Sequence, residues 1–288
     1  MVTSPDSAKR NVLITGASTG IGAGCAAYLH KRGFRVFAGI RKPEDGERLQ
    51  NEISKEVIPV RIDVQDAGSI REAAARFDEA VGGAGLHGLV NNAGIGVPGP
   101  MEFIPLDELR RQFEVNLFGQ VAVTQAFLRY IRPVRGRIVN ISSMGGRVTT
   151  PYVGPYHASK YALEAVNDAL RMELRPWGIS VSCVEPGSIA TPIWTKSKSE
   201  AEKSIDGFSD EAKELYGRRY IRFGDAAMRV GQWGIPPERV AKKVAHALES
   251  SFPRTRYLVG PDAHLMVNLS RILPAKWMDW VILKVMGS

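Results

Sequence analysis

Short apolar runs alternate with amphipathic stretches along most of this chain. The runs are rich in Val, Ile and Leu, and they predict strands at Asn11–Thr15, Arg35–Ile40, Val57–Ile62, Gly88–Asn91, Arg137–Ile141, Ser180–Val184 and Arg256–Val259. The stretches between them predict helices near Ile21–Arg32, Ile70–Ala80, Leu106–Ile131, Pro155–Arg175 and Pro237–Ser250. This alternation predicts an α/β fold, in which seven parallel strands form a doubly wound sheet with helices on both faces.

One segment interrupts the alternation. Residues Thr191–Trp233 are charged and poor in strand signal, and they follow a predicted strand. Open parallel sheets bind ligands beyond the carboxyl ends of their strands, so we expect this segment to be a substrate lid. The chain is therefore interpreted as one domain over residues 10–260, with the lid at 191–233, followed by a tail at 261–288.

Composition and charge restrict the classes of partner. With 288 residues, 44% of them hydrophobic, the chain is long enough to bury one full core. A net charge of +8 is compatible with nucleic-acid binding, but the cations are spread along the chain and no recognition motif accompanies them. We therefore expect a basic surface and an anionic cofactor, and no nucleic-acid partner.

Metal ligands and export signals are not indicated. The five histidines are scattered, and Cys25 and Cys183 stand far apart in the sequence, which argues against a metal site and favours buried structural thiols. Residues Met1–Lys9 lack the apolar core of a secretory signal. We expect a cytoplasmic protein with no metal.

A glycine-rich loop connects the first predicted strand to the first helix. It has the pattern G-x-x-x-G-x-G within Thr15–Gly22. Glycine lets the backbone turn sharply and approach a pyrophosphate, while the helix N-terminus offers free N–H groups. We predict that a dinucleotide is bound there by Gly16, Ser18, Thr19, Gly20, Ile21 and Gly22.

The end of the second predicted strand indicates which dinucleotide is bound. An NAD-selective site has Asp or Glu at this point to bind the adenosine ribose hydroxyls. This chain has Ile40-Arg41-Lys42 instead, with no carboxylate before Glu44. Arg41 can form charge-assisted hydrogen bonds to a 2′-phosphate, which predicts NADP(H); the alternative is that Arg41 is a solvated surface charge.

Two more strand ends fit the same ligand. Asp63-Val64 follows the third predicted strand, where a carboxylate can accept a hydrogen bond from the adenine amino group. Asn91, Ala93 and Gly94 end the fourth. An Asn-rich strand end is otherwise a turn signal, so each site is weak alone.

Tyr156 and Lys160 form a candidate catalytic pair. At positions i and i+4 of a predicted helix they lie on one face. Free tyrosine titrates near pH ~10, and a nearby ammonium group lowers its pKa toward the range of acid-base catalysis. Ser143 ends the preceding strand and can donate a hydrogen bond to a substrate oxygen.

The combined pattern resembles the short-chain dehydrogenase/reductase family over roughly residues 10–260. The matching motifs are Thr15–Gly22, Asp63, Asn91–Gly94, Asn116 within Glu114–Leu117, Ser143, Tyr156 with Lys160, and Pro186–Thr191. The resemblance implies a Rossmann fold and adds Pro186, Gly187, Ile189 and Thr191 to the cofactor site. The serine is Ser143 rather than Ser142 because the family places it thirteen residues before the tyrosine.

The same resemblance implies catalytic roles. Tyr156 is the proton donor in carbonyl reduction and the acceptor in alcohol oxidation, and Ser143 polarises the substrate oxygen. Lys160 binds the nicotinamide ribose and tunes the tyrosine, while Asn116 holds a water molecule of the proton relay. Family members that prefer NADP(H) often have a basic residue where this chain has Thr19, so its phosphate contact depends on Arg41, as in members similar to the 17β-hydroxysteroid dehydrogenases. Within the family, the chain resembles the hydroxysteroid and retinol dehydrogenase-type members.

The predicted function is hydride transfer between NADP(H) and a secondary alcohol or ketone. Apolar residues near the predicted pocket and lid favour a steroid, retinoid or acyl-chain substrate, although such residues often only pack loops: Met144, Tyr152, Trp194, Phe208, Tyr216, Tyr220 and Trp233. One alternative is a catalytically silent NADP(H)-binding regulator, which would be expected to lack Tyr156 or Lys160. The other is a sugar-nucleotide epimerase or dehydratase of the related, longer branch. That branch is characterised by a G-x-x-G-x-x-G loop and a separate substrate domain, and this chain has neither.

The tail contains an amphipathic helix after Pro274. Trp277, Met278, Val281, Ile282 and Val285 fall on one side, Lys276, Asp279 and Lys284 fall on the other, and Trp280 and Leu283 interrupt the polar side. About a dozen residues are too few to cross a bilayer. Three locations of this helix are compatible with the sequence: packing at the substrate pocket of its own subunit, burial between subunits of a homodimer or homotetramer, or peripheral contact with a membrane. We expect packing on protein combined with a second contact, to another subunit or to anionic lipid.

Overall fold

The computed structural model describes residues 9–191, 205 and 207–286 of the chain. Its seven strands are β1 (Asn11–Ile14), β2 (Arg35–Ile40), β3 (Ile58–Arg61), β4 (Gly88–Asn91), β5 (Arg137–Ile141), β6 (Ser180–Pro186) and β7 (Arg256–Val259). All pair in parallel, in the order β3-β2-β1-β4-β5-β6-β7. The predicted seven-stranded doubly wound sheet is confirmed. The strand order reverses between β1 and β4, which opens a crevice at their carboxyl ends.

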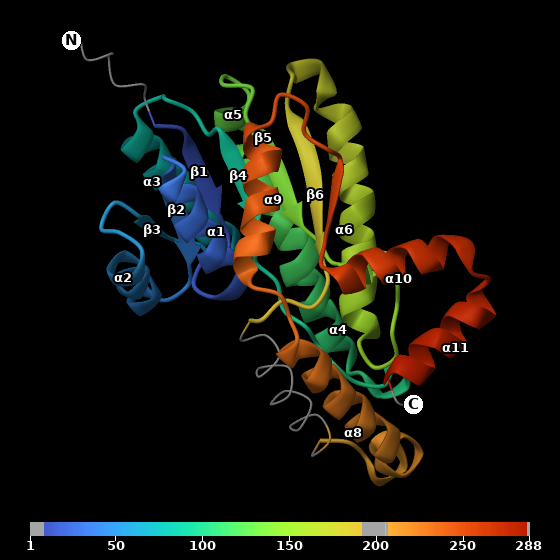
Figure 1. The fold of residues 1–288 in the computed structure, drawn as a ribbon. Helices are drawn as coiled ribbons and strands as arrows, with labels where there is room; N and C mark the ends of the chain where they lie inside the picture. Colours follow the sequence, from blue (N-terminus) through green and yellow to red (C-terminus); the bar gives the residue numbers. More distant parts are fainter. Residues whose placement is uncertain (1–8, 192–204, 206, 287–288) are drawn as a thin grey trace.

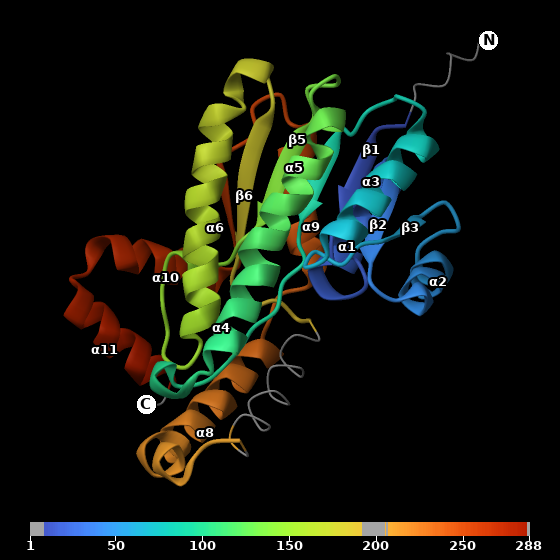
Figure 2. The same ribbon diagram turned by 180° about the vertical axis from the view of Figure 1, so that it is seen from behind.

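Helices cover both faces of the sheet (Figures 1 and 2). The helices α1 (Gly20–Lys31) and α9 (Pro237–Glu249) lie on one face, and α3 (Ala67–Val81), α5 (Gly119–Ile131) and α6 (Gly154–Glu173) lie on the other. Each face has its own buried apolar core, because strands covered on both sides bury every side chain. Strand β1 shows the alternation: Val12 and Ile14 belong to one core, and Leu13 belongs to the other.

The second core contains a cluster of aromatic rings. Phe77 of α3 makes edge contacts with Phe37 and Phe127, at ring centroid distances of 4.8 and 5.8 Å. Phe37, Phe77 and Phe127 are fully buried. These contacts fix α3 and α5 against the sheet and therefore hold the carboxyl ends of the strands in place.

The predicted long helix at Leu106–Ile131 is divided by a wider turn. It consists of α4 (Leu106–Phe113), a π-helical turn at Glu114–Phe118, and α5. The sequence pattern did not show this π turn, because apolar spacing changes little when a single turn widens. The turn places Asn116 in the protein interior, where it is fully buried.

Among the α-helices of the described residues, three were not predicted. They are α2 (Pro43–Glu52), which is strongly polar, α8 (Asp210–Gln232), which lies inside the expected lid, and α10 (Pro261–Ile272). The tail helix was predicted and is α11 (Ala275–Met286). Figures 1 and 2 show α8, α10 and α11 beyond the carboxyl ends of the strands. None of the helices within the described residues is both long enough and apolar enough to cross a lipid bilayer.

The apolar side predicted for α11 is only partly buried. Met278 and Ile282 are buried in a small core with Val148 and Val267, whereas Trp277 and Val285, predicted on the same side, are exposed. The predicted apolar face is therefore wider than the buried one, because α11 contacts its neighbours only along a narrow strip that includes Met278 and Ile282.

Candidate active site

The glycine-rich loop between β1 and α1 needs glycine for steric reasons. Gly16 has a φ of 61°, in the left-handed region that side chains disfavour. A Cβ atom at Gly22 would lie 2.2 Å from the carbonyl oxygen of Gly16. The backbone of the loop therefore lies tightly against the first turn of α1, which opens that helix terminus to an anionic ligand.

The ends of β1 and β4 are fastened together beside this loop. The Thr15 hydroxyl accepts hydrogen bonds from the backbone N–H groups of Asn92 and Ala93, at 2.9 and 3.0 Å. The Asn92 amide donates in return to the carbonyl oxygens of Thr15 and Gly16, at 2.9 and 3.0 Å. This network places Ala93 and Gly94 opposite the loop.

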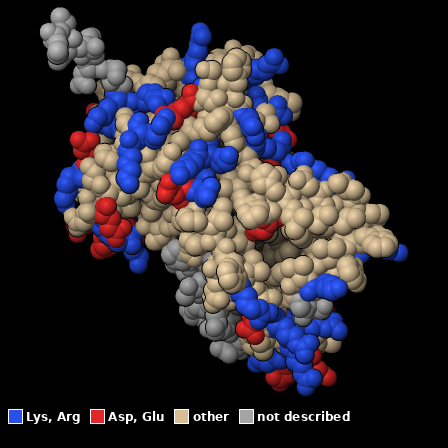
Figure 3. All heavy atoms as spheres, in the orientation of Figure 1, with Lys and Arg blue, Asp and Glu red and all other residues tan. Residues whose placement is uncertain are grey.

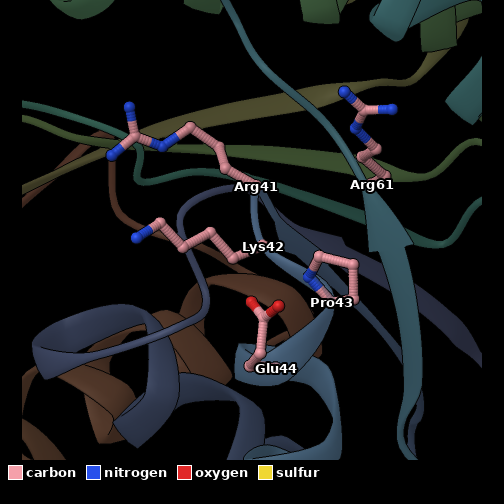
Figure 4. A pocket seen from close by; sticks show the side chains of 5 residues that line it. All are labelled: Arg41, Lys42, Pro43, Glu44 and Arg61. Atoms are coloured by element: carbon pink, nitrogen blue, oxygen red, sulfur yellow. The ribbon is translucent and has the colours of Figure 1, made fainter.

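A basic hollow lies at the ends of β2 and β3. It has a volume of about 690 Å³ and is lined by Arg41, Lys42, Pro43, Glu44 and Arg61 (Figure 4). Ile40 pairs with Arg61 across the two strands, so Arg41 and Arg61 leave the sheet at neighbouring points. The prediction named Arg41 alone. The same reasoning about strand ends would have found Arg61, which directly precedes Ile62-Asp63.

The helix α2, which the sequence pattern did not indicate, supports the phosphate loop. The Arg48 guanidinium donates to the Ser18 carbonyl oxygen at 2.6 Å and to the Asp45 carboxylate at 2.8 Å. Arg48 therefore links the helix beside the basic hollow to the loop.

Tyr156 and Lys160 lie in the first turns of α6, facing β5. The Lys160 ammonium group donates to the carbonyl oxygen of Ile141 at 2.8 Å and lies 5.8 Å from the centre of the Tyr156 ring. Ser143 precedes a short 3₁₀ turn after β5, and its hydroxyl accepts a hydrogen bond from the backbone N–H of Gly145 at 3.0 Å. The same hydroxyl acts to lower the pKa of Tyr156, whereas the Ser142 hydroxyl is buried without a hydrogen-bond partner, which favours Ser143 as the serine of the site.

Burial governs the titration of this pair. Desolvation raises the pKa of Tyr156, opposed by the hydrogen bond from Ser143. Desolvation also lowers the pKa of Lys160 to about 8, and the nearby Cys183 and Glu164 act against this shift. The expected lowering of the Tyr156 pKa is therefore not found, because loss of hydration is the largest influence on this buried hydroxyl.

Two asparagines of the predicted site are held by protein contacts. The Asn116 amide group donates to Ile95 O at 3.0 Å and Ser159 Oγ at 3.1 Å, and its oxygen accepts from Ile95 N at 2.9 Å. Asn91 donates to Thr124 and Asn140 inside the core, at 2.8 and 2.9 Å. Asn116 therefore fixes the backbone at Ile95, Asn91 is tied to side chains of the core, and neither residue lines the pocket.

One continuous pocket of about 810 Å³ joins the glycine loop to the tyrosine. Of the predicted site residues, only Gly22, Asn91 and Asn116 are absent from its lining. The residues that do line it are Gly16, Ser18, Thr19, Gly20, Ile21, Arg41, Asp63, Val64, Ala93, Gly94, Ser143, Tyr156, Lys160, Pro186, Gly187, Ile189 and Thr191.

Beyond Tyr156 the pocket is largely apolar. This end is lined by Met144, Val148, Phe223, Met228, Met266 and Met286, from four separate segments of the chain. Of the residues expected near the substrate, Met144 and Tyr220 line it, and Trp194 lies outside the described residues. Tyr152, Phe208 and Tyr216 pack instead against other aromatic rings, and Trp233 is 87% exposed.

A buried charged cluster lies behind Lys160, and the sequence interpretation missed it. Arg256 lies 3.0 Å from the Glu164 carboxylate and 3.2 Å from that of Glu185. Desolvation and the nearby Glu164 charge raise the pKa of Glu185. Within the described part of the chain, no group of three or more His, Cys, Asp or Glu side chains is arranged to hold a metal ion.

Known proteins share this architecture. The short chain dehydrogenase family model matches residues 10–202. The chain is 36% identical to 3-amino-tetrahydro-pyrrolizinone reductase of Xenorhabdus hominickii, covering 94% of each protein, and 35% identical to NADPH-dependent 3-dehydrocapnine reductase of Ornithobacterium rhinotracheale, covering 96% of each. A short chain dehydrogenase of Burkholderia cenocepacia in complex with NADP superposes with a TM-score of 0.72 at 25% identity, covering 96% of this chain and 98% of that one. These matches do not favour the silent regulator or the epimerase. The chain belongs to the short-chain dehydrogenase family of oxidoreductases.

Proposed function

We propose that this protein uses NADP(H) to interconvert an apolar ketone and its secondary alcohol. The observation that carries the proposal is the single pocket that joins the glycine loop and Arg41 to Tyr156, Lys160 and Ser143. One bound dinucleotide can therefore contact the loop with its phosphates and the tyrosine with its nicotinamide.

The N–H groups and cations of the pocket fit an anionic dinucleotide that carries a 2′-phosphate besides its pyrophosphate. The loop offers close backbone approach and the N-terminus of α1. Arg41, Lys42 and Arg61 line the hollow where an adenosine 2′-phosphate would lie, and Asp63 and Val64, which line the adjoining pocket, would contact the adenine. The NADPH-dependent relative and the NADP complex described above support the same choice.

The chemistry follows from the polar groups around Tyr156. NADPH supplies the hydride when it is bound. Tyr156 donates its proton to the carbonyl oxygen, and Ser143 donates a hydrogen bond to the same oxygen. Lys160 would hold the nicotinamide ribose hydroxyls of a bound cofactor, and its positive charge stabilises the phenolate that proton donation leaves. In this proposal Asn116 positions the backbone of the relay beside Ile95.

The substrate end favours a large apolar molecule. Methionine side chains are flexible and polarizable, so Met144, Met228, Met266 and Met286 adapt to apolar ligands of different shape. We assign residues 10–260 to the catalytic domain, with 191–233 as its lid and 261–288 as a tail that completes the pocket through Met266 and Met286. We also propose a cytoplasmic homodimer or homotetramer.

Substrate screening tests this function. Ketones and alcohols of increasing apolar size are offered with NADPH or NADP⁺, and the nicotinamide absorbance is followed. We expect turnover that increases with apolar size and is stronger with NADPH than with NADH. The proposal is wrong if no member of the series changes the absorbance at a concentration of protein that binds NADPH.

A further inference from the structure

The two tail helices are buried on their inner sides only. Met278 and Ile282 of α11 pack against Val148 and Val267. This small core holds the tail on the catalytic domain, next to the substrate end of the pocket. The contacts account for one side of the hairpin that α10 and α11 form.

The outer side of the same hairpin is apolar. Trp277 and Trp280 are 66% and 58% exposed, and helical geometry puts them roughly opposite Met278 and Ile282. Leu283 of α11 is also exposed, as are Leu265 and Ile272 of α10. We call these five residues the tail face. Grouped large apolar side chains of this kind mark an interaction surface.

The polar residues of the tail identify the kind of surface that it fits. Residues 265–286 contain three cations, Arg271, Lys276 and Lys284, and one carboxylate, Asp279. The Lys284 ammonium group lies 4.7 Å from the centre of the Trp280 ring. Tryptophan with flanking lysine is typical of helices that lie at the headgroup level of a membrane, whereas lysine is depleted from protein interfaces.

The tail face also adjoins the mouth of the pocket. Met266 of α10 and Met286 of α11 line the pocket on one side, and Tyr220 and Met228 of α8 line it on the other. Figure 3 shows a hollow between α8 and the α10–α11 hairpin, beside a nearly uncharged part of the hairpin surface. A protein seated over the tail face would obstruct this hollow, whereas a lipid surface would present apolar substrate to it.

We propose that the tail face docks on an anionic lipid surface and that apolar substrate reaches the pocket from that surface. Trp277 and Trp280 enter the boundary between headgroups and acyl chains, while Lys276 and Lys284 contact lipid phosphates. The docking is independent of the proposed function, and only the route of the substrate rests on it.

Vesicle flotation tests the docking with the full chain. The vesicles are phosphatidylcholine alone or phosphatidylcholine mixed with phosphatidylglycerol. We expect flotation with the anionic vesicles, and a loss of about tenfold or more in vesicle affinity for Trp277→Ser/Trp280→Ser. The matched control is Trp177→Ser: Trp177 is 50% exposed but lies next to the amino-terminal end of β6, away from the pocket. Lys276→Gln/Lys284→Gln should reduce the preference for anionic lipid.

Several outcomes would overturn the docking. The first is that the protein floats with neither kind of vesicle. The second is that Trp177→Ser loses as much vesicle affinity as Trp277→Ser/Trp280→Ser. The third is that the wild type is an oligomer that does not bind vesicles, and that size-exclusion chromatography shows this oligomer dissociated in the tail double variant. Flotation without any ketone reduction would leave the docking intact and contradict the proposed function. Ketone reduction without flotation would support the proposed function and contradict the docking. If the route is correct, the double variant raises KM only for substrate supplied in anionic vesicles.

Discussion

The two ends of the pocket are built in different ways. The cofactor end consists of strand termini and backbone: Gly16 approaches Gly22, and Thr15 is bonded to the ends of β4. The substrate end consists of apolar side chains from α8, α10, α11 and the segment after β5. Sheet register fixes the first end, and adaptable side-chain packing forms the second. Substitutions should therefore affect cofactor and substrate separately, except at Tyr156, where the two ends meet.

The largest effect is expected at that meeting point. Tyr156→Phe keeps the ring packing but removes the proton donor, so turnover should fall by about 10²–10⁴-fold. NADPH affinity should change little, because the ring does not hold the dinucleotide phosphates. Tyr161→Phe, on the exposed side of α6, is the control and should keep full activity. Near-normal turnover in Tyr156→Phe would contradict the assigned role.

A smaller effect is expected at the cofactor end. Ile40→Asp puts a carboxylate near the expected 2′-phosphate, and Arg41→Ala removes a cation from it; each should lower kcat/KM with NADPH by about 10–100-fold. Use of NADH should survive, because the glycine loop is untouched. Arg61→Ala should act in the same direction as Arg41→Ala. The measurement is kcat/KM with NADPH and with NADH for each variant. A wild type that prefers NADH would contradict the role of Arg41 in binding the 2′-phosphate.

The substrate end should tolerate change better. Met228→Ala shortens an apolar side chain in the lining, so KM for a large ketone should rise about threefold to tenfold with little change in kcat. A short ketone should be unaffected, and so should NADPH affinity. The exposed Met172 offers a control, Met172→Ala. If cofactor affinity changed as much as substrate KM, the two ends would not be separable.

The smallest effect concerns the charged cluster behind Lys160. Because the folded protein raises the pKa of Glu185, this group favours folding below the ordinary glutamate pKa, and that contribution is lost as pH rises toward neutrality. In Glu185→Gln the decline in unfolding free energy between about pH 5 and 8 should be smaller by about 1–2 kcal/mol. Denaturant titrations across this range measure it, with the exposed Glu173→Gln as control. Equal pH dependence in wild type and Glu185→Gln would refute the shift.

The contrast between the two ends also explains what the sequence could predict. The strands were found because buried parallel strands are continuous apolar runs, and the glycine loop and Arg41 were found because each follows a strand directly. Arg61 also stands at a strand end and could have been found in the same way, whereas Arg48 reaches the site only through α2, a strongly polar helix that the apolar pattern does not reveal. The charged cluster joins α6, β6 and β7, and such contacts between distant segments leave no local pattern.

Isotope transfer tests the central claim most directly. Wild-type protein is mixed with NADPH deuterated at the reactive nicotinamide carbon and with the best apolar ketone from the screen, and the product is analysed by mass spectrometry. The account predicts one deuterium at the new carbinol carbon, formed at least about 10²-fold faster by the wild type than by Tyr156→Phe at equal NADPH occupancy. Bound NADPH that transfers no deuterium to any ketone, or equal transfer by both proteins, would contradict it.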